Sequence, residues 1–326
     1  MKVLINRPIH PTALAELEKH ATVCAAFTAS TPELTEMLPS ADALLLCAGY
    51  SIGAQEMAKA PRLRVIGRHG VGLDNVDVQA ATEHGIPLVY TPYGPTESTA
   101  EHAFALMFAV ARRLPFLDRA TRAGRFGIRN QLESRGLELR GKVLGIVGFG
   151  RIGQRLAEMS RQALDMTILV YDPFLNAGTV QDLNATLVPD LCDLARQVDI
   201  LSLHIPATPE THHLIDSTVI QAMGKHAILI NAARGAVLDQ AALVQALQEG
   251  RIYGAGIDVY DPEPPPDDNP LFALDRVVLS PHIASNTEEG RLLMGMTVVK
   301  DIVAVLEGKR PQYLANAQVW ENRRQP

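Results

Sequence analysis

The sequence has few cysteines, no long apolar run and no dense block of one charge. Its three cysteines, Cys24, Cys47 and Cys192, form neither a CxxC pair nor a metal-ligand spacing with histidine, so neither a disulfide framework nor a metal site is expected. No apolar run approaches the ~18 residues of a membrane span, and the beginning, MKVLINRP, becomes polar too early for a signal peptide. These absences predict a cytoplasmic protein that does not enter the membrane.

The charge pattern excludes further classes. The formal net charge is −6, and the 30 lysines and arginines are scattered along the chain. Without a basic cluster we expect no nucleic-acid partner and no anchoring to an acidic membrane surface. Small anionic ligands stay compatible with this composition, because a local arginine can bind them whatever the net charge. The length of 326 residues predicts two domains.

Short apolar runs alternate with helical patterns along most of the chain. The first series of runs is KVLI, ADALLLC, LRVIG and IPLVY; after Gly141 a second series follows, KVLGIVG, MTILVYD, DILSLHI, HAILINA, GAGIDVY and RVVLSPH. Continuous apolar strands separated by helices are typical of parallel sheets buried on both faces. The sequence therefore predicts an α/β protein with two doubly wound parallel sheets.

Two helical segments set the expected domain boundaries. Residues 98–126 form a long helical pattern, broken at Pro115, that connects the two series. The amphipathic pattern from Gly290 to Glu307 is long enough to return to the first domain. We therefore expect one domain from residues 1–99 and 284–326, and a second from residues 100–283.

A glycine-rich turn opens the second series. Gly148, Gly150 and Gly153 form G-x-G-x-x-G between an apolar strand and an amphipathic helix. The first glycine permits a tight turn, the second lets the backbone approach a pyrophosphate, and the third lets helix and strand pack closely. The helix N-terminus adds free N–H groups for the phosphates. Although such glycines also serve ordinary turns, this context favours a dinucleotide site.

An acidic residue follows at the next strand end. Asp172 lies about 20 residues beyond the glycines, where a carboxylate accepts the ribose hydroxyls of NAD. Pro173 and Phe174 come next, and no Arg or Lys stands nearby to neutralise a 2′-phosphate. The pattern therefore predicts NAD rather than NADP.

Three polar residues follow apolar strands of the second series. Arg234 comes after AILINAA, Glu263 lies in DVYDPEPPP, and His282 ends the run VVLSPH. Each alone has an ordinary structural role: capping carbonyls, solvating a loop, or ending a strand. Their common position is the reason to group them, because ligands of open α/β sheets bind beyond the carboxyl ends of the strands.

The chemistry of this trio suits the interconversion of a 2-hydroxy acid and a 2-oxo acid. Histidine is the usual side chain for moving a proton near neutral pH. A carboxylate beside the imidazole orients it and favours its protonated form. Arginine presents a planar fork to a carboxylate and stabilises charge on a carbonyl oxygen.

Taken together, the motifs RHGVGLDNVD, GFGRIG, INAARG, DVYDPEP and PHIAS resemble the D-2-hydroxyacid dehydrogenase family, in order and spacing, over essentially the whole chain. The resemblance is greatest to its phosphoglycerate dehydrogenase-like branch. It implies a Rossmann NAD-binding domain inserted into a flavodoxin-like substrate domain, and a homodimer joined through the cofactor domains by the connecting segment.

The resemblance also implies roles for individual residues. Arg234 would bind the substrate carboxylate and carbonyl, His282 would act as acid and base, and Glu263 would be its partner. The substrate carboxylate would also be held by the backbone of Gly70, Val71 and Gly72. The cofactor would be bound by Gly148, Gly150, Arg151, Ile152, Gly153, Asp172, Pro206, Ala232 and Asp258, the last through the nicotinamide carboxamide.

The substrate stays open among small 2-oxo acids. Enzymes for phosphorylated substrates usually have a basic residue after the third strand of the small domain, where this chain has LLLCAGYSIGA without Arg or Lys. We therefore expect glyoxylate or hydroxypyruvate, with D-3-phosphoglycerate as the alternative to which Arg68 could contribute. At the nearby turn YGPTEST, we expect Glu97 to face solvent rather than a cationic or hydroxylated substrate tail.

A different class is a non-enzymatic NAD-sensing protein related to corepressors of this fold. The intact trio does not exclude it, because such relatives can retain these residues. Turnover of any small 2-oxo acid separates the two classes.

Overall fold

The computed structural model describes residues 1–27 and 31–325. These form two compact units: unit 1 contains residues 1–96 and 285–326, and unit 2 contains residues 97–284. The first boundary lies three residues before the one expected from the sequence, and the second lies one residue after it. No helix in the described part of the chain is long and apolar enough to span a membrane.

Unit 1 is built on a parallel sheet with the strand order β2-β1-β3-β4-β5, which is the flavodoxin-like order. Its strands are β1 (Lys2–Ile5), β2 (Thr22–Ala25), β3 (Ala43–Leu46), β4 (Val65–Arg68) and β5 (Leu88–Val89). Its helices are α1 (Pro11–Glu18), α2 (Thr31–Met37), α3 (Ala54–Ala58), α4 (Val78–Glu83) and α12 (Glu288–Leu306).

Strand β3 shows why the runs of this sheet are continuously apolar. Leu44 and Leu46 belong to the core under α3 and α4, whereas Ala43 and Leu45 belong to the core under α1 and α12. All four side chains are fully buried, because successive residues of a strand point to opposite faces. Helix α12 packs against α1 and β4, so the last long helix of the chain completes unit 1.

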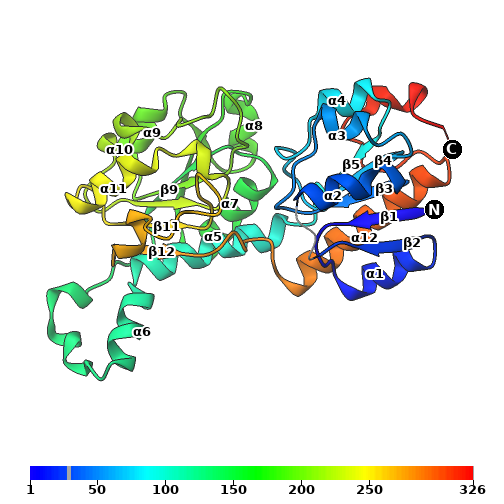
Figure 1. Cartoon of the computed structure of the whole chain (residues 1–326). Coiled ribbons are helices and arrows are strands. Elements are labelled where there is room, and N and C mark those ends of the chain that lie inside the picture. The colour runs from blue at the N-terminus through cyan, green and yellow to red at the C-terminus, as the bar shows by residue number, and fades with distance from the viewer. Residues whose placement is uncertain (28–30, 326) are drawn as a thin grey trace. The chain divides into compact units, whose positions relative to one another are not determined.

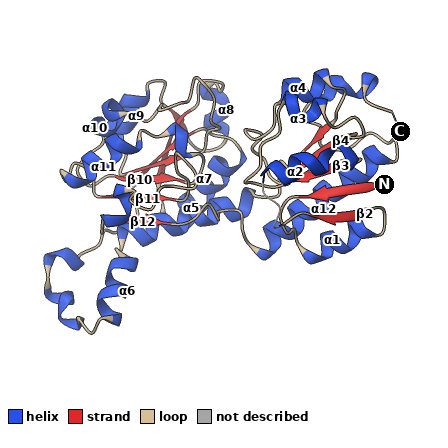
Figure 2. Cartoon of the chain, in the orientation of Figure 1, coloured by secondary structure: helices blue, strands red, loops and turns tan. Residues whose placement is uncertain are grey.

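Unit 2 carries a parallel sheet with the order β12-β11-β10-β9-β6-β7-β8, in which the strand order reverses beside β6 as in a Rossmann domain. Its strands are β6 (Val143–Val147), β7 (Thr167–Tyr171), β8 (Thr186–Leu187), β9 (Ile200–Leu203), β10 (Ile228–Asn231), β11 (Gly254–Ile257) and β12 (Val277–Leu279). Its helices are α5 (Thr96–Ala111), α6 (Leu114–Arg122), α7 (Arg151–Leu164), α8 (Ala177–Asp182), α9 (Leu191–Gln197), α10 (Ser217–Ala222) and α11 (Gln240–Gln248). Figures 1 and 2 show helices flanking the strands of each unit.

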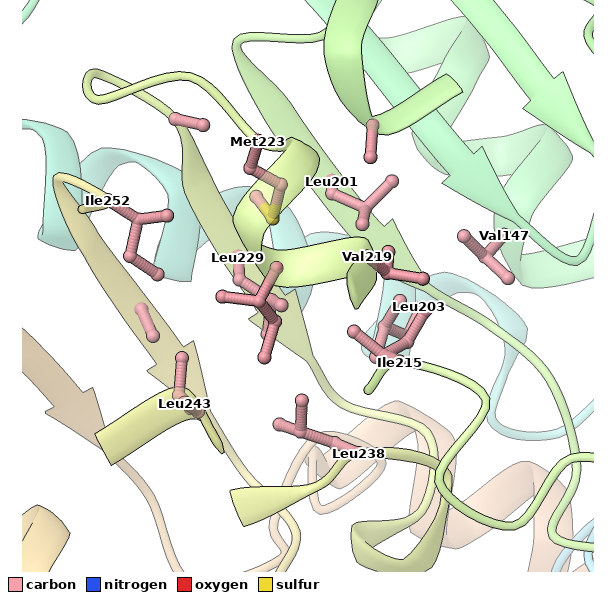
Figure 3. Packing of buried hydrophobic residues seen from close by; sticks show 14 of the residues in the cluster. Val147, Leu201, Leu203, Ile215, Val219, Met223, Leu229, Leu238, Leu243 and Ile252 are labelled. Atoms are coloured by element: carbon pink, nitrogen blue, oxygen red, sulfur yellow. The ribbon is translucent and has the colours of Figure 1, made fainter. Parts of the chain in front are cut away.

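Each face of the unit 2 sheet has its own core. One core joins the strands to α9, α10 and α11, through residues such as Leu194, Val219 and Leu243. Figure 3 shows the side chains of Val219, Met223, Leu243 and their neighbours interdigitating on this face. The other core joins the strands to α5, α7 and α8. Burial on both faces holds the strand ends in place, and the site lies at those ends.

Two strands and one helix break were not expected from the sequence. Strands β2 and β8 lie at sheet edges; β2 is only half-buried, and β8 has two residues, so neither has a continuous apolar run. The connecting helix ends at Ala111, ahead of the expected break at Pro115. Arg113 adopts a left-handed φ of 52°, and Pro115 lies in the first turn of α6, where proline is tolerated.

Candidate active site

The polar residues predicted from the sequence follow three neighbouring strands of unit 2. Strands β10, β11 and β12 are adjacent and parallel, so their carboxyl ends lie along one edge of the sheet. Arg234 follows β10, Glu263 follows β11 and His282 follows β12. The fold therefore places all three segments along the same edge.

His282 and Glu263 form a direct pair. The imidazole Nδ1 lies 2.5 Å from Glu263 Oε1, and both side chains are over one third exposed. Because the carboxylate accepts a hydrogen bond from Nδ1, the contact fixes the ring orientation. The other ring nitrogen, Nε2, is then the atom that can exchange a proton with a ligand.

The loop that carries His282 is held by Asp258. His282 has a left-handed φ of 53°, a conformation that is unfavourable for residues other than glycine by roughly 1–2 kcal/mol. Its N–H donates to the Asp258 carbonyl over 2.7 Å. The N–H groups of Ile283 and Ala284 donate to Asp258 Oδ1 and Oδ2 over 3.0 and 2.9 Å, and the Ser280 hydroxyl donates to Oδ1 over 2.6 Å.

Asp258 is fully buried. Burial alone would raise the pKa of its carboxyl, but hydrogen bonds from His102, Ser280 and the two backbone N–H groups outweigh burial and lower that pKa. The side chain is therefore a carboxylate inside the core.

Arg234 is positioned by its own strand and by the next one. The Asn231 side chain, at the end of β10, donates to the Arg234 carbonyl over 2.9 Å and accepts from Ala233 N over 3.1 Å. A Cβ on Gly235 would lie 1.9 Å from the Tyr260 carbonyl oxygen, so only glycine lets the chain after β10 pass so close to the chain after β11. Asn231 and Gly235 are positioning residues that motif reasoning did not single out.

Tyr260 links these segments to the third strand. Its hydroxyl donates to the Ser280 carbonyl over 3.0 Å. Burial, with the carboxylates of Asp258 and Glu263, raises its pKa to about 12, so it stays a hydrogen-bond donor at physiological pH.

The glycine turn in the same unit has the geometry that a dinucleotide needs. Gly148 has a φ of 88°, and a Cβ there would lie 2.7 Å from the His204 carbonyl oxygen; a Cβ on Gly153 would lie 2.5 Å from the Gly148 carbonyl oxygen. A Cβ on Gly150 would meet no described atom within 4 Å. The first and third glycines are thus required by packing, whereas the second leaves space over the N-terminus of α7. These residues fit a pyrophosphate.

Asp172, at the end of β7, lies beside this turn. Its Oδ2 accepts from Phe149 N over 2.9 Å, and its Oδ1 accepts from Phe174 N over 3.0 Å. The carboxylate is therefore fixed next to the glycine loop. The other residues expected at the cofactor lie nearby in the chain or at strand ends: Arg151 and Ile152 begin α7, Ala232 follows β10, and the Pro206 carbonyl accepts from Thr211 Oγ1 over 2.7 Å.

In unit 1, the loop Gly70–Gly72 follows β4. Gly70 has a φ of 148°, and the Arg68 guanidinium donates to the carbonyls of His69 and Gly72 over 2.5 and 3.0 Å. Arg68 thus supports this loop from within. Val71 is 39% exposed, and Gly70 and Gly72 are half-buried.

Two charged residues near the expected substrate segments have partners that the sequence did not reveal. Arg7, just after β1, lies against Gly49, where a Cβ would be 2.4 Å from its Nη2. The loop after β3 therefore has a cation beside it, although its own sequence has none. Glu97 accepts two hydrogen bonds from Arg155 Nε and one from Nη2. Glu97 is exposed to solvent, as expected, and its carboxylate is in addition paired with Arg155 of α7.

Among the described residues, a single group of three potential metal ligands meets within 4.8 Å: His212, His213 and Asp261. All three are exposed, and the two imidazoles stack with ring centroids 4.0 Å apart. The pair His282–Glu263 is separate from this group.

The fold of unit 2 and its glycine turn define a dinucleotide-binding domain of the Rossmann type. The model of the protein family described as "D-isomer specific 2-hydroxyacid dehydrogenase, NAD binding domain" matches residues 104–284, which is more than half of the chain. The chain belongs to the D-isomer specific 2-hydroxyacid dehydrogenase family. The predicted family and fold class are confirmed.

Relatives of two kinds are similar over nearly the whole chain. A D-3-phosphoglycerate dehydrogenase of Archaeoglobus fulgidus is 40% identical over 94% of this chain, which spans only 58% of that protein's length. A glyoxylate reductase of Aeropyrum pernix is 41% identical over 98% of this chain and 96% of its own. An NADPH-dependent glyoxylate/hydroxypyruvate reductase of Sinorhizobium meliloti, solved with NADP and malonate, superposes with a TM-score of 0.87 at 30% identity and covers 100% of this chain and 99% of its own. An NAD(P)-binding domain is therefore shown, and the choice between the two cofactors is a separate question.

Proposed function

We propose that this protein interconverts a small D-2-hydroxy acid and its 2-oxo acid with a nicotinamide cofactor. The observation that carries the proposal is the pairing of His282 Nδ1 with Glu263 at 2.5 Å, on the same sheet edge as Arg234. Such a pair leaves a histidine nitrogen to transfer a proton, and the glycine turn of the same unit fits the cofactor.

The residues of this chain would divide the work as follows. The bound nicotinamide supplies or accepts the hydride. During reduction His282 donates a proton from Nε2 to the carbonyl oxygen, and in oxidation it takes that proton back. Glu263 stabilises the protonated imidazole, and Arg234 neutralises negative charge on the substrate. This chemistry needs no metal ion.

We further propose NAD(H) as the preferred cofactor. Asp172 is fixed beside the glycine loop by Phe149 N and Phe174 N, where its carboxylate would repel a 2′-phosphate. The segment from residue 173 to 190 contains no Arg or Lys to counter that repulsion. The cofactor set would be Gly148, Gly150, Arg151, Ile152, Gly153, Asp172, Pro206, Ala232 and Asp258.

For the substrate we propose glyoxylate or hydroxypyruvate, with the backbone of Gly70, Val71 and Gly72 and the Arg234 side chain as carboxylate ligands. The similarity to a glyoxylate reductase over 98% of this chain and 96% of that protein supports this choice. The Arg68 guanidinium already donates to two backbone carbonyls, which argues against a role for Arg68 in binding a substrate phosphate. One observation favours D-3-phosphoglycerate as the second candidate: Arg7 places a cation beside the loop after β3.

The deciding experiment is oxidation of NADH and NADPH by the purified protein with glyoxylate, hydroxypyruvate, phosphohydroxypyruvate, pyruvate and longer 2-oxo acids. We expect kcat/KM of about 10⁴ M⁻¹s⁻¹ or more for glyoxylate or hydroxypyruvate, with NADH preferred. A preference for phosphohydroxypyruvate that is lost in Arg7→Ala would establish the second candidate. Tight NADH binding without turnover of any of these acids would contradict the dehydrogenase proposal and favour a sensor.

We also propose a homodimer in the cytoplasm. The segment from α6 through the short 3₁₀ helices η2 (Phe126–Asn130) and η3 (Leu132–Ser134) projects from the rest of unit 2 (Figure 1). It has a small core of its own, Phe116, Ala120 and Ile128, and exposes Leu114, Phe126 and Leu132 at 53%, 64% and 73%. Such apolar exposure on a projecting segment supports a protein contact. The three free cysteines suit a reducing compartment.

A further inference from the structure

A second histidine lies behind the loop that carries His282. His102, on α5, has its Nε2 2.9 Å from the Ser280 hydroxyl and 3.5 Å from Asp258 Oδ1. Its side chain is 21% exposed, whereas Asp258 is fully buried. The same Ser280 and Asp258 hold the backbone of residues 282–284, so His102 touches the support of the catalytic loop.

The direction of these hydrogen bonds follows from the donors available. Asp258 is a carboxylate, which only accepts, so the single proton of the Ser280 hydroxyl is committed to Oδ1 at 2.6 Å. The contact between His102 Nε2 and Ser280 Oγ can then be a hydrogen bond only if Nε2 carries the proton. The order of donation is therefore from His102 to Ser280 to Asp258.

The close approach of α5 to β11 explains why His102 reaches this place. On β11 the residues Gly254 and Gly256 and, two positions on, Asp258 point to one face. A Cβ on Gly254 would lie 2.8 Å from Val110 Cγ1, and a Cβ on Gly256 would lie 3.0 Å from Leu106 Cβ. The two glycines thus let the helix lie directly on the strand.

The rise along α5 over four residues is close to the rise along β11 over two residues, so the contacts between them repeat. His102, Leu106 and Val110 are four residues apart on one face of α5, a rise of about 6.0 Å per step. Gly254, Gly256 and Asp258 are two residues apart, a rise of about 6.6 Å per step. Since Val110 meets Gly254 and Leu106 meets Gly256, the next step of the register places His102 opposite Asp258.

We propose that His102 is a positioning residue for the proton transfer. Its N–H fixes the Ser280 hydroxyl on Asp258, and Asp258 in turn keeps residues 282–284 in the conformation in which His282 Nδ1 meets Glu263. His102 touches neither substrate nor cofactor in this role. The inference rests on the proposed function for its kinetic consequence, but its structural consequence can be measured without turnover.

The test compares His102→Leu with His102→Gln, whose side-chain amide can donate a hydrogen bond to Ser280 as Nε2 does. Glu101→Gln, an exposed change one residue away on the same helix, is the control. In His102→Leu we expect kcat for 2-oxo acid reduction to fall about 10-fold with a smaller change in KM, and the amides of residues 282–284 to exchange with solvent at least about 10-fold faster. His102→Gln should recover both to within about 3-fold of the parent.

Ser280→Ala tests the order of the chain of hydrogen bonds. If His102 acts through Ser280, the double variant His102→Leu/Ser280→Ala should be no slower than the slower single variant. Independent, multiplying losses would overturn the proposal. So would a His102→Leu protein with a lowered Tm but parental kcat and parental exchange at residues 282–284.

If the proposed function fails, wild-type protein turns over none of the acids, and the exchange measurement still decides the role of His102. Should His102→Leu fail to fold, His102→Gln and Ser280→Ala supply the comparison. If the amides of residues 282–284 then exchange as slowly in Ser280→Ala as in the parent protein, the inference is contradicted.

Discussion

At the residue scale, the work of His282 depends on the charge of Glu263. Reduction of a 2-oxo acid requires a protonated imidazole, which the carboxylate 2.5 Å away stabilises. In Glu263→Gln we expect kcat/KM for reduction to fall, because the imidazole loses the carboxylate that orients the ring and stabilises its protonated form. The measurement is kcat/KM between pH 5 and 9, with the exposed Glu138→Gln as control. An unchanged profile would mean that Glu263 is not the partner.

Arg234 tests the value of a planar fork as opposed to a charge. Lysine keeps the positive charge but cannot make two parallel hydrogen bonds to a carboxylate. We expect Arg234→Lys to lower kcat/KM about 100-fold, which is about 2.7 kcal/mol of transition-state binding, with Tm nearly unchanged. Near-normal kinetics would mean that Arg234 has only a structural role, in which its guanidinium donates a hydrogen bond to the Ala233 carbonyl over 2.7 Å.

At the scale of the element, different glycines in the turn between β6 and α7 are needed for packing and for cofactor binding. Gly150 has room for a Cβ, and its φ of −72° suits any residue. Gly150→Ala should therefore keep the parental Tm but weaken NADH binding at least about 10-fold, because the methyl group occupies the space over the helix N-terminus. Gly153→Ala should instead lower Tm, since its Cβ would meet the Gly148 carbonyl.

Calorimetry and NADH titration by fluorescence measure the two effects separately. Gly224→Ala, where a Cβ also meets no described atom within 4 Å, is the control for a methyl group added elsewhere in unit 2. Parental NADH affinity in Gly150→Ala would show that no phosphate approaches this turn.

At the scale of the whole molecule, acid should destabilise both units before the carboxylates titrate. Burial and the nearby Arg68 lower the pKa of His69 to about 4, and burial lowers that of His204 to about 4. Between the ordinary value of 6.5 and 4 the unfolded chain binds more protons than the folded one, so stability falls as pH falls through this window.

We therefore expect Tm to decrease steadily from pH 7 to pH 4.5. His69→Gln in unit 1 should flatten this dependence, because a neutral side chain replaces the buried imidazole. The contributions of Asp42, Glu97 and Asp258, whose pKa values are lowered in the folded protein, are lost only at lower pH. A Tm that stays constant down to pH 4.5 would contradict this assignment.

The proposed dimer is also a property of the whole molecule. Light scattering should give twice the chain mass of 35.4 kDa. Replacing the exposed Phe126 and Leu132 by aspartate should lower the measured mass to that of one chain. The variant should stay folded, because neither side chain belongs to the small core of this segment. Leu183→Asp, 40% exposed elsewhere in unit 2, controls for an added surface charge. A dimeric double variant would exclude this segment as the contact.

The sequence by itself determined the local features of this protein. Continuous apolar runs such as ALLL in β3 predict buried parallel strands, because both faces of each strand are covered. The spacing of Gly148, Gly150 and Gly153 predicts the turn, since each glycine answers a local steric demand. Arg234, Glu263 and His282 could be grouped because parallel strands end at a common edge.

Only the tertiary structure decided which distant residues meet. Arg7 lies against Gly49, Arg155 binds Glu97, and His102 reaches Ser280, across separations of 42, 58 and 178 residues. Edge strands β2 and β8 escaped prediction for a related reason, because backbone pairing with a neighbour holds them more than their own side chains do. Such contacts depend on how each helix packs on its sheet. The sequence pattern shows which residues form the helix and the strand, but not which residue of one lies opposite which residue of the other.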